Sequence, residues 1–166
     1  LTLNPSEEDE FIDEDINLKG YLKEIISSFE ETSKKEFILN IDQDSNPKKI
    51  TKSIEIIYGL RNFIGNANKY SKKKIYISLK SDNEFSEIII EDDGEGYPND
   101  IISKIGEPYL KTVSQNNKTM SGLGLGIFIG KTLLEKNFAS INCRNSITRR
   151  GAEVRIKWKN KDLFKI

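Results

Sequence analysis

The sequence predicts an α+β fold, a two-layer sandwich in which one mixed sheet carries its helices on one face. Segments with helical and strand periodicity follow one another in the order helix, strand, helix, strand, strand, helix, strand, strand. Two pairs of consecutive strand-like runs are each joined by a polar turn, which is typical of hairpins. The 166 residues suffice for one domain with a real core but not for two comfortable ones. Together these observations favour helices that gather on one side of a single sheet.

The chain begins with an acidic stretch that precedes the first predicted helix. Seven of residues 1–16 are acidic, so we expect this stretch to be a linker and the domain itself to span 17–166. Apolar residues at helical spacing predict an amphipathic helix over 17–33. The alternating segment 36–42 predicts a strand.

The longest helical candidate covers residues 49–70. Its apolar stripe begins with Ile50 and Ile54, which indicates a helix with one buried face. Gly59 and Gly65 lower its helix propensity. Close packing or a nearby ligand would explain glycine at these two positions.

The second half of the chain contains the two predicted hairpins and a third long helix. The first hairpin has strands at 73–80 and 86–92, and the second has strands at 139–145 and 151–158. Between them lie a short helix at 99–104, a polar connection over 106–121 and a helix over 123–137. A connection this long inside a compact domain is usually functional or disordered.

Composition excludes several classes of function. Lys plus Arg and Asp plus Glu balance at 26 each, so bulk charge gives no case for nucleic acid. No apolar run approaches the roughly 20 residues of a membrane-spanning helix. The chain has no histidine, which excludes histidine-based catalysis and histidine metal ligands within it. The single cysteine, Cys143, fits a reducing compartment, and we expect it to be a packed core thiol.

The predicted helix over 49–70 carries the first candidate site. Asn62 and Asn66 stand four residues apart, so both side chains can point the same way. An amide oxygen suits Mg²⁺, which takes oxygen ligands and often keeps water and phosphate oxygens as well. Lys69 could reach a phosphate as a point charge. A solvated polar helix face is the alternative interpretation of these residues.

A sharp glycine turn, DDGEG, follows the predicted strand 86–92 and forms the second candidate site. Gly94 and Gly96 permit positive φ and close backbone approach. The carboxylate of Asp92 at the strand end could accept a hydrogen bond from an exocyclic amino group such as adenine N6. A glycine turn with solvated acids is the alternative, whereas the spacing excludes an EF-hand.

The third candidate site is the stretch GLGLG over 122–126, which opens the predicted helix 123–137. It matches neither the P-loop nor the Rossmann fingerprint, because Leu125 and Ile127 stand where those motifs require glycine. Unpaired N–H groups at a helix start favour a polyphosphate, and glycine lets phosphates approach the backbone. A flexible loop entering an apolar helix is the alternative. Together and in this order, the three sites predict one nucleotide pocket covered by a lid.

These blocks resemble the N, G1, F and G2 boxes of the ATP-binding domain of sensor histidine kinases, which has the GHKL or Bergerat fold. The boxes correspond to residues 62–70, 92–96, 106–112 and 122–126. The runs YGLRNFIGNA, DDGEGYP, GEPYLKT and GLGLGIFIGKTLLEK are most similar to the RegB/PrrB redox-responsive type. The resemblance covers about 17–158, and it implies a Bergerat sandwich with an ATP lid.

The resemblance also implies ATP and Mg²⁺ as ligands and a role for each matching residue. Asn66 would be the main Mg²⁺ ligand with Asn62 in support, and Lys69 would contact phosphate. The nucleotide would be bound by Tyr70, Asp92, Gly94, Gly96, Tyr109, Gly122, Leu123, Gly124, Leu125 and Gly126. Two positions stand out: Gly106 replaces the phenylalanine with which many of these kinases begin the F box, and Gly151 matches a small-residue position in the closing hairpin.

The resemblance implies partners that this chain does not itself contain. A sensor histidine kinase phosphorylates a histidine on a dimerisation domain, which passes the phosphoryl group to an aspartate of a response regulator. Because this chain has no histidine, we expect a catalytic domain that cannot autophosphorylate alone. We expect this domain to be cytoplasmic and, by itself, monomeric. The full-length protein would be a homodimer, and it could be anchored in the inner membrane.

Three other functions remain open from the sequence. A GHKL ATPase clamp of the gyrase, MutL or HSP90 kind would share the nucleotide site, but it uses an acidic base where this chain has Asn62. An anti-sigma serine kinase would share the fold and transfer phosphate to serine. A non-catalytic nucleotide-sensing module is supported only by glycine at position 106.

Overall fold

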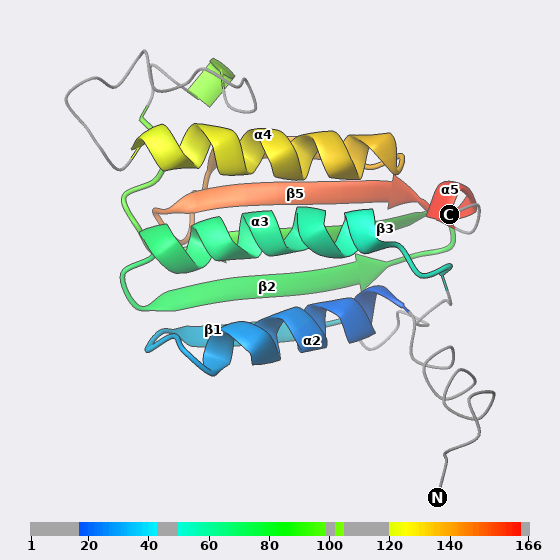
Figure 1. Ribbon diagram of the computed structural model, residues 1–166, viewed down its shortest axis with the longest axis horizontal. Coiled ribbons are helices and arrows are strands. Elements are labelled where there is room, and N and C mark those ends of the chain that lie inside the picture. Colours follow the sequence, from blue (N-terminus) through cyan, green and yellow to red (C-terminus); the bar gives the residue numbers. More distant parts are fainter. Residues whose placement is uncertain (1–16, 43–49, 99–101, 105–119, 164–166) are drawn as a thin grey trace, which may run out of the picture.

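A computed structural model describes residues 17–42, 50–98, 102–104 and 120–163, with the backbone alone at 103 and 120–125. It contains one five-stranded mixed sheet with three long helices lying across one face (Figure 1). This arrangement confirms the predicted α+β two-layer sandwich. The elements are α2 (Leu18–Glu30), β1 (Glu36–Ile41), α3 (Ile54–Tyr70), β2 (Lys74–Ser81), β3 (Phe85–Asp92), the 3-10 helix η1 (Ile102–Lys104), α4 (Met120–Lys136), β4 (Ser140–Asn145), β5 (Ala152–Lys159) and α5 (Asn160–Leu163).

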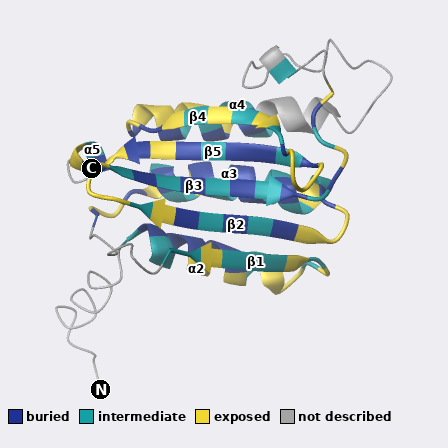
Figure 2. Ribbon diagram, turned by 180° about the vertical axis from the view of Figure 1, so that it is seen from behind, coloured by how far each residue is buried: buried dark blue, intermediate teal, exposed yellow. Residues whose placement is uncertain are grey.

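The sheet order is β1-β2-β3-β5-β4, with β1 parallel to β2 and every other pair antiparallel. Both predicted hairpins are confirmed, as β2–β3 and β4–β5. Alternate residues point to opposite faces, so Ile77, Ile90 and Val154 stand side by side beneath the helices. Seen from behind, none of the described helices covers the other face of the sheet (Figure 2).

Side-chain caps define the start of the first two helices. The Asn17 side chain accepts the N–H of Gly20 at 2.8 Å, and the Ser53 hydroxyl accepts the N–H of Ile56 at 3.2 Å. The prediction that the second helix begins at 49 is therefore wrong, because Ser53 is extended and ends the preceding segment. Ile54 does not belong to a buried stripe either, since 62% of it is exposed.

The third long helix begins earlier than predicted, at Met120 rather than at 123. Gly122, Gly124 and Gly126 therefore lie in its first two turns, so the alternative of a flexible glycine loop that enters the helix does not hold for the described backbone. Packing outweighs the low helix propensity of glycine here, because Ile127 and Leu134 of this helix are fully buried. The predicted helix at 99–104 is only the short η1 in its described part.

The core lies between the helices and the sheet. Its largest fully buried side chains are Trp158 and Phe63, followed by isoleucines and leucines of α2, α3, β2 and β3. The indole N–H of Trp158 donates to the carbonyl of Asn137 at 3.1 Å, which ties β5 to the end of α4. This packing holds α3 and α4 against each other on one face of the sheet.

Several expectations concern residues outside the described ranges. The linker over 1–16, Gly106 and Tyr109 fall there, so they stay predictions. Within the described ranges, no helix combines the length and the apolar character needed to cross a membrane.

Candidate nucleotide site

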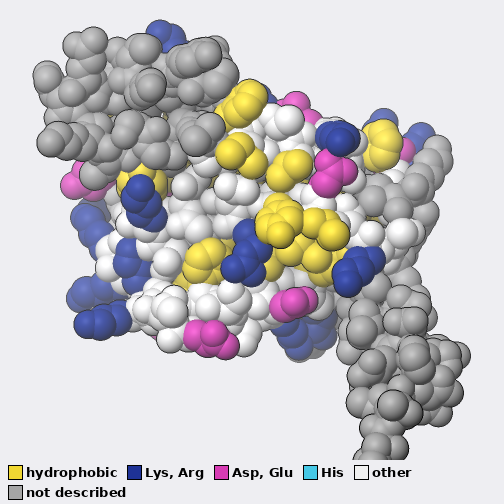
Figure 3. All heavy atoms as spheres, in the orientation of Figure 1, with side chains coloured by type: hydrophobic (Ala, Val, Ile, Leu, Met, Phe, Trp, Pro, Cys, Tyr) yellow, Lys and Arg dark blue, Asp and Glu magenta, His cyan; other side chains and the backbone are white. Residues whose placement is uncertain are grey.

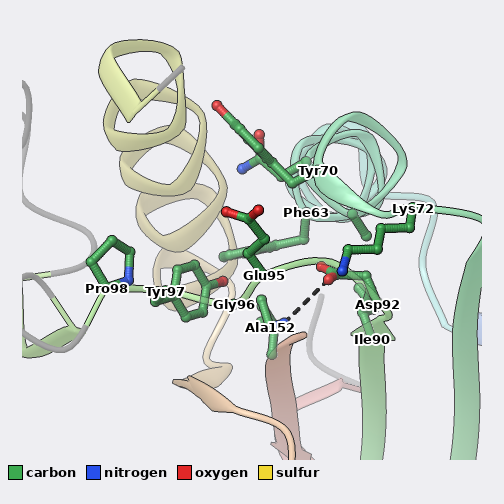
Figure 4. A pocket seen from close by; sticks show the side chains of 13 residues that line it. Phe63, Tyr70, Lys72, Ile90, Asp92, Glu95, Gly96, Tyr97, Pro98 and Ala152 are labelled. Carbon is green, nitrogen blue, oxygen red and sulfur yellow. Dashed lines mark hydrogen bonds between the residues drawn. The ribbon is translucent and has the colours of Figure 1, made fainter. Parts of the chain in front are cut away.

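A pocket of about 250 Å³ opens between α3, the loop that follows β3 and the start of β5. Figure 4 shows Phe63 and Tyr70 extending from α3, Asp92 at the end of β3, and Glu95, Tyr97 and Pro98 on the loop. The pocket therefore brings together side chains from segments far apart in the sequence. Its lining is formed by Phe63, Asn66, Ala67, Tyr70, Lys72, Ile90, Asp92, Glu95, Gly96, Tyr97, Pro98, Ala152 and Val154.

Asp92 supplies a buried carboxylate to this pocket. Only 4% of the residue is exposed. Its Oδ1 accepts the N–H of Gly94 at 2.9 Å. The same oxygen accepts the N–H of Ala152 at 3.2 Å, which is the dashed line in Figure 4. Burial raises the pKa of Asp92 above its ordinary value, although these two backbone bonds lower it in part. Within the described residues no hydrogen bond uses Oδ2, so this oxygen can accept from a ligand.

Glycines allow the backbone to close around Asp92. A Cβ at Gly151 would overlap the carbonyl and carboxylate oxygens of Asp92, and a Cβ at Gly94 would overlap the Tyr70 carbonyl. Gly96 has φ +79°, a conformation that side-chain-bearing residues rarely adopt. The expectation that the glycine turn needs close approach and positive φ is therefore confirmed, at Gly94 and Gly96 respectively.

Asn66 joins the first candidate site to the third. It lines the pocket, and its buried Nδ2 has no hydrogen-bond partner in the described part of the chain. A Cβ at Gly126 of α4 would lie 3.2 Å from both amide atoms, so α4 passes directly over this side chain. Since no described residue holds the Asn66 Nδ2, the amide can turn its oxygen toward a cation, which fits a single-amide Mg²⁺ ligand.

The other residues predicted on α3 contribute unequally. Tyr70 lines the pocket. Lys69 is exposed and does not line it, and its ammonium lies 5.3 Å from the centre of the Tyr70 ring. Asn62 donates to the carbonyl of Tyr58 at 2.8 Å within α3, so its side chain is engaged by its own helix.

The remaining predicted residues lie on α4 or outside the described ranges. The backbone of Gly122, Leu123, Gly124 and Leu125 belongs to the first turns of α4, and their role in binding the nucleotide stays a prediction. Among the described residues, no group of three or more histidine, cysteine or acidic side chains could hold a metal ion.

Sequence reasoning missed most of the pocket wall, because only Asn66, Tyr70, Asp92 and Gly96 of its lining residues were predicted site residues. Phe63 and Ile90 stand at regular apolar positions of α3 and β3, where the pattern predicts only core. Lys72 stands in a run of three lysines at the start of a predicted strand, a pattern that is typical of a solvated strand end. Tyr97 and Pro98 directly follow the predicted glycine turn, and this adjacency was the one signal that could have identified them.

Comparison with a protein-family model is consistent with this geometry. The model of the family described as histidine kinase-, DNA gyrase B- and HSP90-like ATPases matches residues 51–162, well over half of the chain. The matched segment contains α3, the β2–β3 hairpin, α4 and the β4–β5 hairpin. It therefore includes every element that lines the pocket.

Curated relatives include sensor kinases that are much longer than this chain. The sensor histidine kinase RegB of Cereibacter sphaeroides is 38% identical over 108 residues, which cover 62% of this chain and 23% of RegB. The sensor protein kinase PilS of Pseudomonas aeruginosa is 33% identical over 93 residues, which cover 52% of this chain and 16% of PilS. The chain thus spans less than a quarter of the length of these relatives.

Solved structures share the fold at low identity. The mycobacterial sensor histidine kinase MprB matches with a TM-score of 0.70 and 19% identity, covering 87% of this chain and 96% of the MprB chain. The nucleotide-free catalytic domain of the histidine kinase ThkA matches with a TM-score of 0.69 and 20% identity, covering 87% and 94%. At this identity the likeness is one of architecture.

Proposed function

Because the chain belongs to the family of histidine kinase-, DNA gyrase B- and HSP90-like ATPases and is an ATP-binding domain of the sensor kinase type, we propose that it catalyses phosphoryl transfer from ATP to a protein histidine. The acceptor would lie on a separate dimerisation domain of the full-length protein. A response regulator aspartate would receive the phosphoryl group next. A cytoplasmic location for this domain is part of the same proposal.

The observation that carries the proposal is the meeting of Asp92, Asn66 and Gly126 around one pocket. Asp92 and Asn66 both line it, and Gly126 lies against the Asn66 amide. A carboxylate oxygen at the floor suits an amino group of the base, whereas an amide under a glycine-rich helix suits the phosphate end. These two ends predict adenine beside Asp92 and the triphosphate beside α4.

Asn66 would hold Mg²⁺ together with phosphate oxygens. The unpartnered amide of Asn66 and the absence of a Cβ on Gly126 support this assignment. The bound ion would neutralise negative charge on the phosphates. Asn62 in support and Lys69 at the phosphate are proposed from the family resemblance, and both would need to turn from their positions against Tyr58 and Tyr70.

The chain's own contribution would be orientation rather than covalent chemistry. Asp92 would fix the base, and the aromatic and aliphatic side chains around it would exclude water from that end of the pocket. The backbone at the start of α4 would orient the phosphates toward the acceptor histidine. Positioning and charge neutralisation supply most of the catalysis in phosphoryl transfer.

A reconstitution experiment tests the proposal. The 166-residue chain is mixed with radiolabelled ATP, Mg²⁺ and the separately produced dimerisation domain of the full-length protein. We expect an acid-labile, base-stable phosphate on the histidine of that domain. A histidine-to-alanine variant of the dimerisation domain is the matched control. If both pieces are folded, ATP is bound and no such phosphate forms, the kinase proposal is wrong.

The same experiment separates the alternatives. Appreciable ATP hydrolysis by the isolated chain favours an ATPase clamp, and phosphate on a partner serine favours an anti-sigma kinase. Failure to bind an ATP analogue with Mg²⁺ favours a non-catalytic module. Asn62 stands where clamps carry their acidic base, which favours the histidine kinase over the clamp.

A further inference from the structure

The loop over residues 94–98 forms one wall of the pocket, and apart from the buried Gly94 and Tyr97 little within the loop holds it in place. Glu95 and Pro98 are exposed, and Gly96 lacks a side chain. Gly96 also adopts φ +79°, in a region that glycine visits about as readily as the other half of its range. A loop of this composition needs an external anchor to keep one conformation.

Asn145 at the end of β4 provides that anchor. Its Oδ1 accepts the backbone N–H of Tyr97 at 2.6 Å, and its Nδ2 donates to the backbone carbonyl of Tyr97 at 2.9 Å. One side-chain amide thus satisfies both backbone groups of a residue that is 48 positions away. Asn145 does not itself line the pocket.

Two neighbouring contacts make this anchor specific. A Cβ at Gly96 would lie 2.7 Å from Asn145 Oδ1, so the amide fits only against a glycine backbone. The Tyr97 side chain is 7% exposed and packs in the core, where its hydroxyl interacts with Cys143, two residues before Asn145 on β4. Strand β4 therefore contacts Tyr97 at two points, its backbone through Asn145 and its side chain through Cys143.

We propose that Asn145 is a positioning residue for the nucleotide, acting through the backbone of Tyr97 to hold the 94–98 loop in its binding conformation. The inference deepens the proposed function and depends on it for the identity of the ligand. Without the anchor, the loop would become ordered only when the nucleotide binds. The loss of conformational entropy on binding would then weaken the affinity for the nucleotide.

The test combines nucleotide affinity with a local measurement at the loop. Asn145→Ala removes both bonds, whereas Asn145→Asp keeps an acceptor for the Tyr97 N–H and loses the donor. Asn142→Ala is the matched control, because Asn142 is an exposed asparagine of the same strand. The readouts are the Kd for ATP with Mg²⁺, amide hydrogen exchange at Tyr97, and exchange at Ile156 as a measure of global stability.

We expect Asn145→Ala to raise the Kd about tenfold, as the loss of a partly buried anchor with two hydrogen bonds predicts. Exchange at Tyr97 should accelerate far more than exchange at Ile156. Asn145→Asp should retain part of the Tyr97 protection and lose less affinity, and Asn142→Ala should match the parent chain. If Asn145→Ala does not fold, Asn145→Asp supplies both readouts.

Two results would overturn the inference. One is an unchanged Kd in both Asn145 variants, and the other is equal acceleration at Tyr97 and Ile156, which would make Asn145 a general stability residue. A parent chain that binds no ATP would instead refute the proposed function. In that case the exchange at Tyr97 still decides whether Asn145 holds the loop.

Discussion

Asp92 uses its two carboxylate oxygens for different purposes. Oδ1 holds the backbone of Gly94 and Ala152, and Oδ2 is left for a ligand. An asparagine at this position can keep its oxygen on the two backbone donors and would then present an NH₂ group to the pocket. The fold can therefore survive a substitution that reverses the hydrogen-bonding character of the pocket floor.

We expect Asp92→Asn to weaken ATP binding by about 1–3 kcal/mol, because an amino group of adenine would face another donor. The gap between ATP and GTP affinity should narrow, since the guanine O6 is an acceptor. Titration calorimetry with both nucleotides measures the effect, and thermal unfolding checks that the variant is folded. Unchanged ATP affinity in a folded variant would contradict the adenine assignment.

Asp93 anchors the turn between α3 and β2. Its carboxylate accepts the N–H of Lys72 at 2.8 Å, of Lys73 at 3.1 Å and of Lys74 at 3.2 Å. Partial burial alone would raise the pKa of Asp93, but these three donors outweigh it and hold the pKa below its ordinary value. Because Lys72 lines the pocket, this carboxylate also fixes one edge of the site.

Asp93→Asn should destabilise the chain by about 1–2 kcal/mol at neutral pH, because an amide cannot accept on both sides. The pKa of Asp93 is lower in the folded than in the unfolded chain, so its contribution is present above the unfolded value of about 3.9 and is lost as the pH falls through the folded-state value. Urea unfolding from pH 7 to pH 3 measures the difference between variant and parent. A difference that does not shrink on acidification would show that the charge of Asp93 is not its source.

At the scale of elements, α3 and α4 pack closely through glycine. A Cβ at Gly59 would lie 2.6 Å from Cγ of the fully buried Leu134, and a Cβ at Gly130 would lie 2.9 Å from the ring of Phe63. A Cβ at Gly65 would meet only the edge of the Phe29 ring at 3.4 Å, an ordinary contact. Close packing against α4 therefore explains the glycine at position 59, but it does not explain the glycine at position 65.

Gly59→Ala and Gly65→Ala form a matched pair within α3. Both gain about 1 kcal/mol of helix propensity, but only Gly59→Ala overpacks the core, at a cost of about 1–3 kcal/mol. We expect Gly59→Ala to lower the free energy of unfolding and Gly65→Ala to leave it unchanged or raise it. Denaturant unfolding of both variants decides the point. Similar stabilities would mean that α4 moves away without cost.

The elements themselves were predictable because each has a strong local period. The five strands and three long helices appear where alternation and helical spacing place them. The start of α3 was not predictable. The apolar spacing extends back to Ile50, but the Ser53 side chain caps the helix, so the helix begins only at Ile54. The pairing of β3 with β5 was not predictable either, because no local sequence pattern indicates which two hairpins lie next to each other in the sheet.

The site residues that belong to a short sequence motif were predictable. Those whose role depends on a contact between residues far apart in the sequence were not. Asp92 and Asn66 were identified from their spacing and neighbours, and the structure brings both to one pocket. Asn145 lies in an ordinary predicted strand, and its importance comes from a bond to Tyr97 across 48 residues. Gly151 was recognised only through resemblance, although its reason is the space that Asp92 occupies.

At the scale of the whole molecule, the two broad faces differ in chemistry. The helical face carries large exposed apolar side chains, with Ile54 at 62% and Tyr58 at 56% exposed on α3 (Figure 3). The open face of the sheet instead carries ion pairs, in which Arg144 and Arg155 both bond to Glu153. Ile54 and Tyr58 lie in the first half of α3, whereas the pocket residues of this helix lie between Phe63 and Tyr70. An exposed apolar surface on the same helix is the better candidate for docking a helical partner domain.

We therefore expect Tyr58→Ala, alone or with Ile54→Ser, to lower phosphotransfer to the separate dimerisation domain by about tenfold, the effect of losing one aromatic contact at an interface. The Kd for ATP should not change, because neither side chain lines the pocket. Lys80→Ala, an exposed change on β2, is the control for the opposite face. The rate of phosphotransfer is measured against the concentration of the dimerisation domain. A rise in KM at constant kcat indicates weaker docking, whereas a fall in kcat indicates impaired catalysis. Transfer at the parental rate by Tyr58→Ala with Ile54→Ser would place the docking surface elsewhere, since no other exposed apolar pair on α3 is available in the described part of the chain.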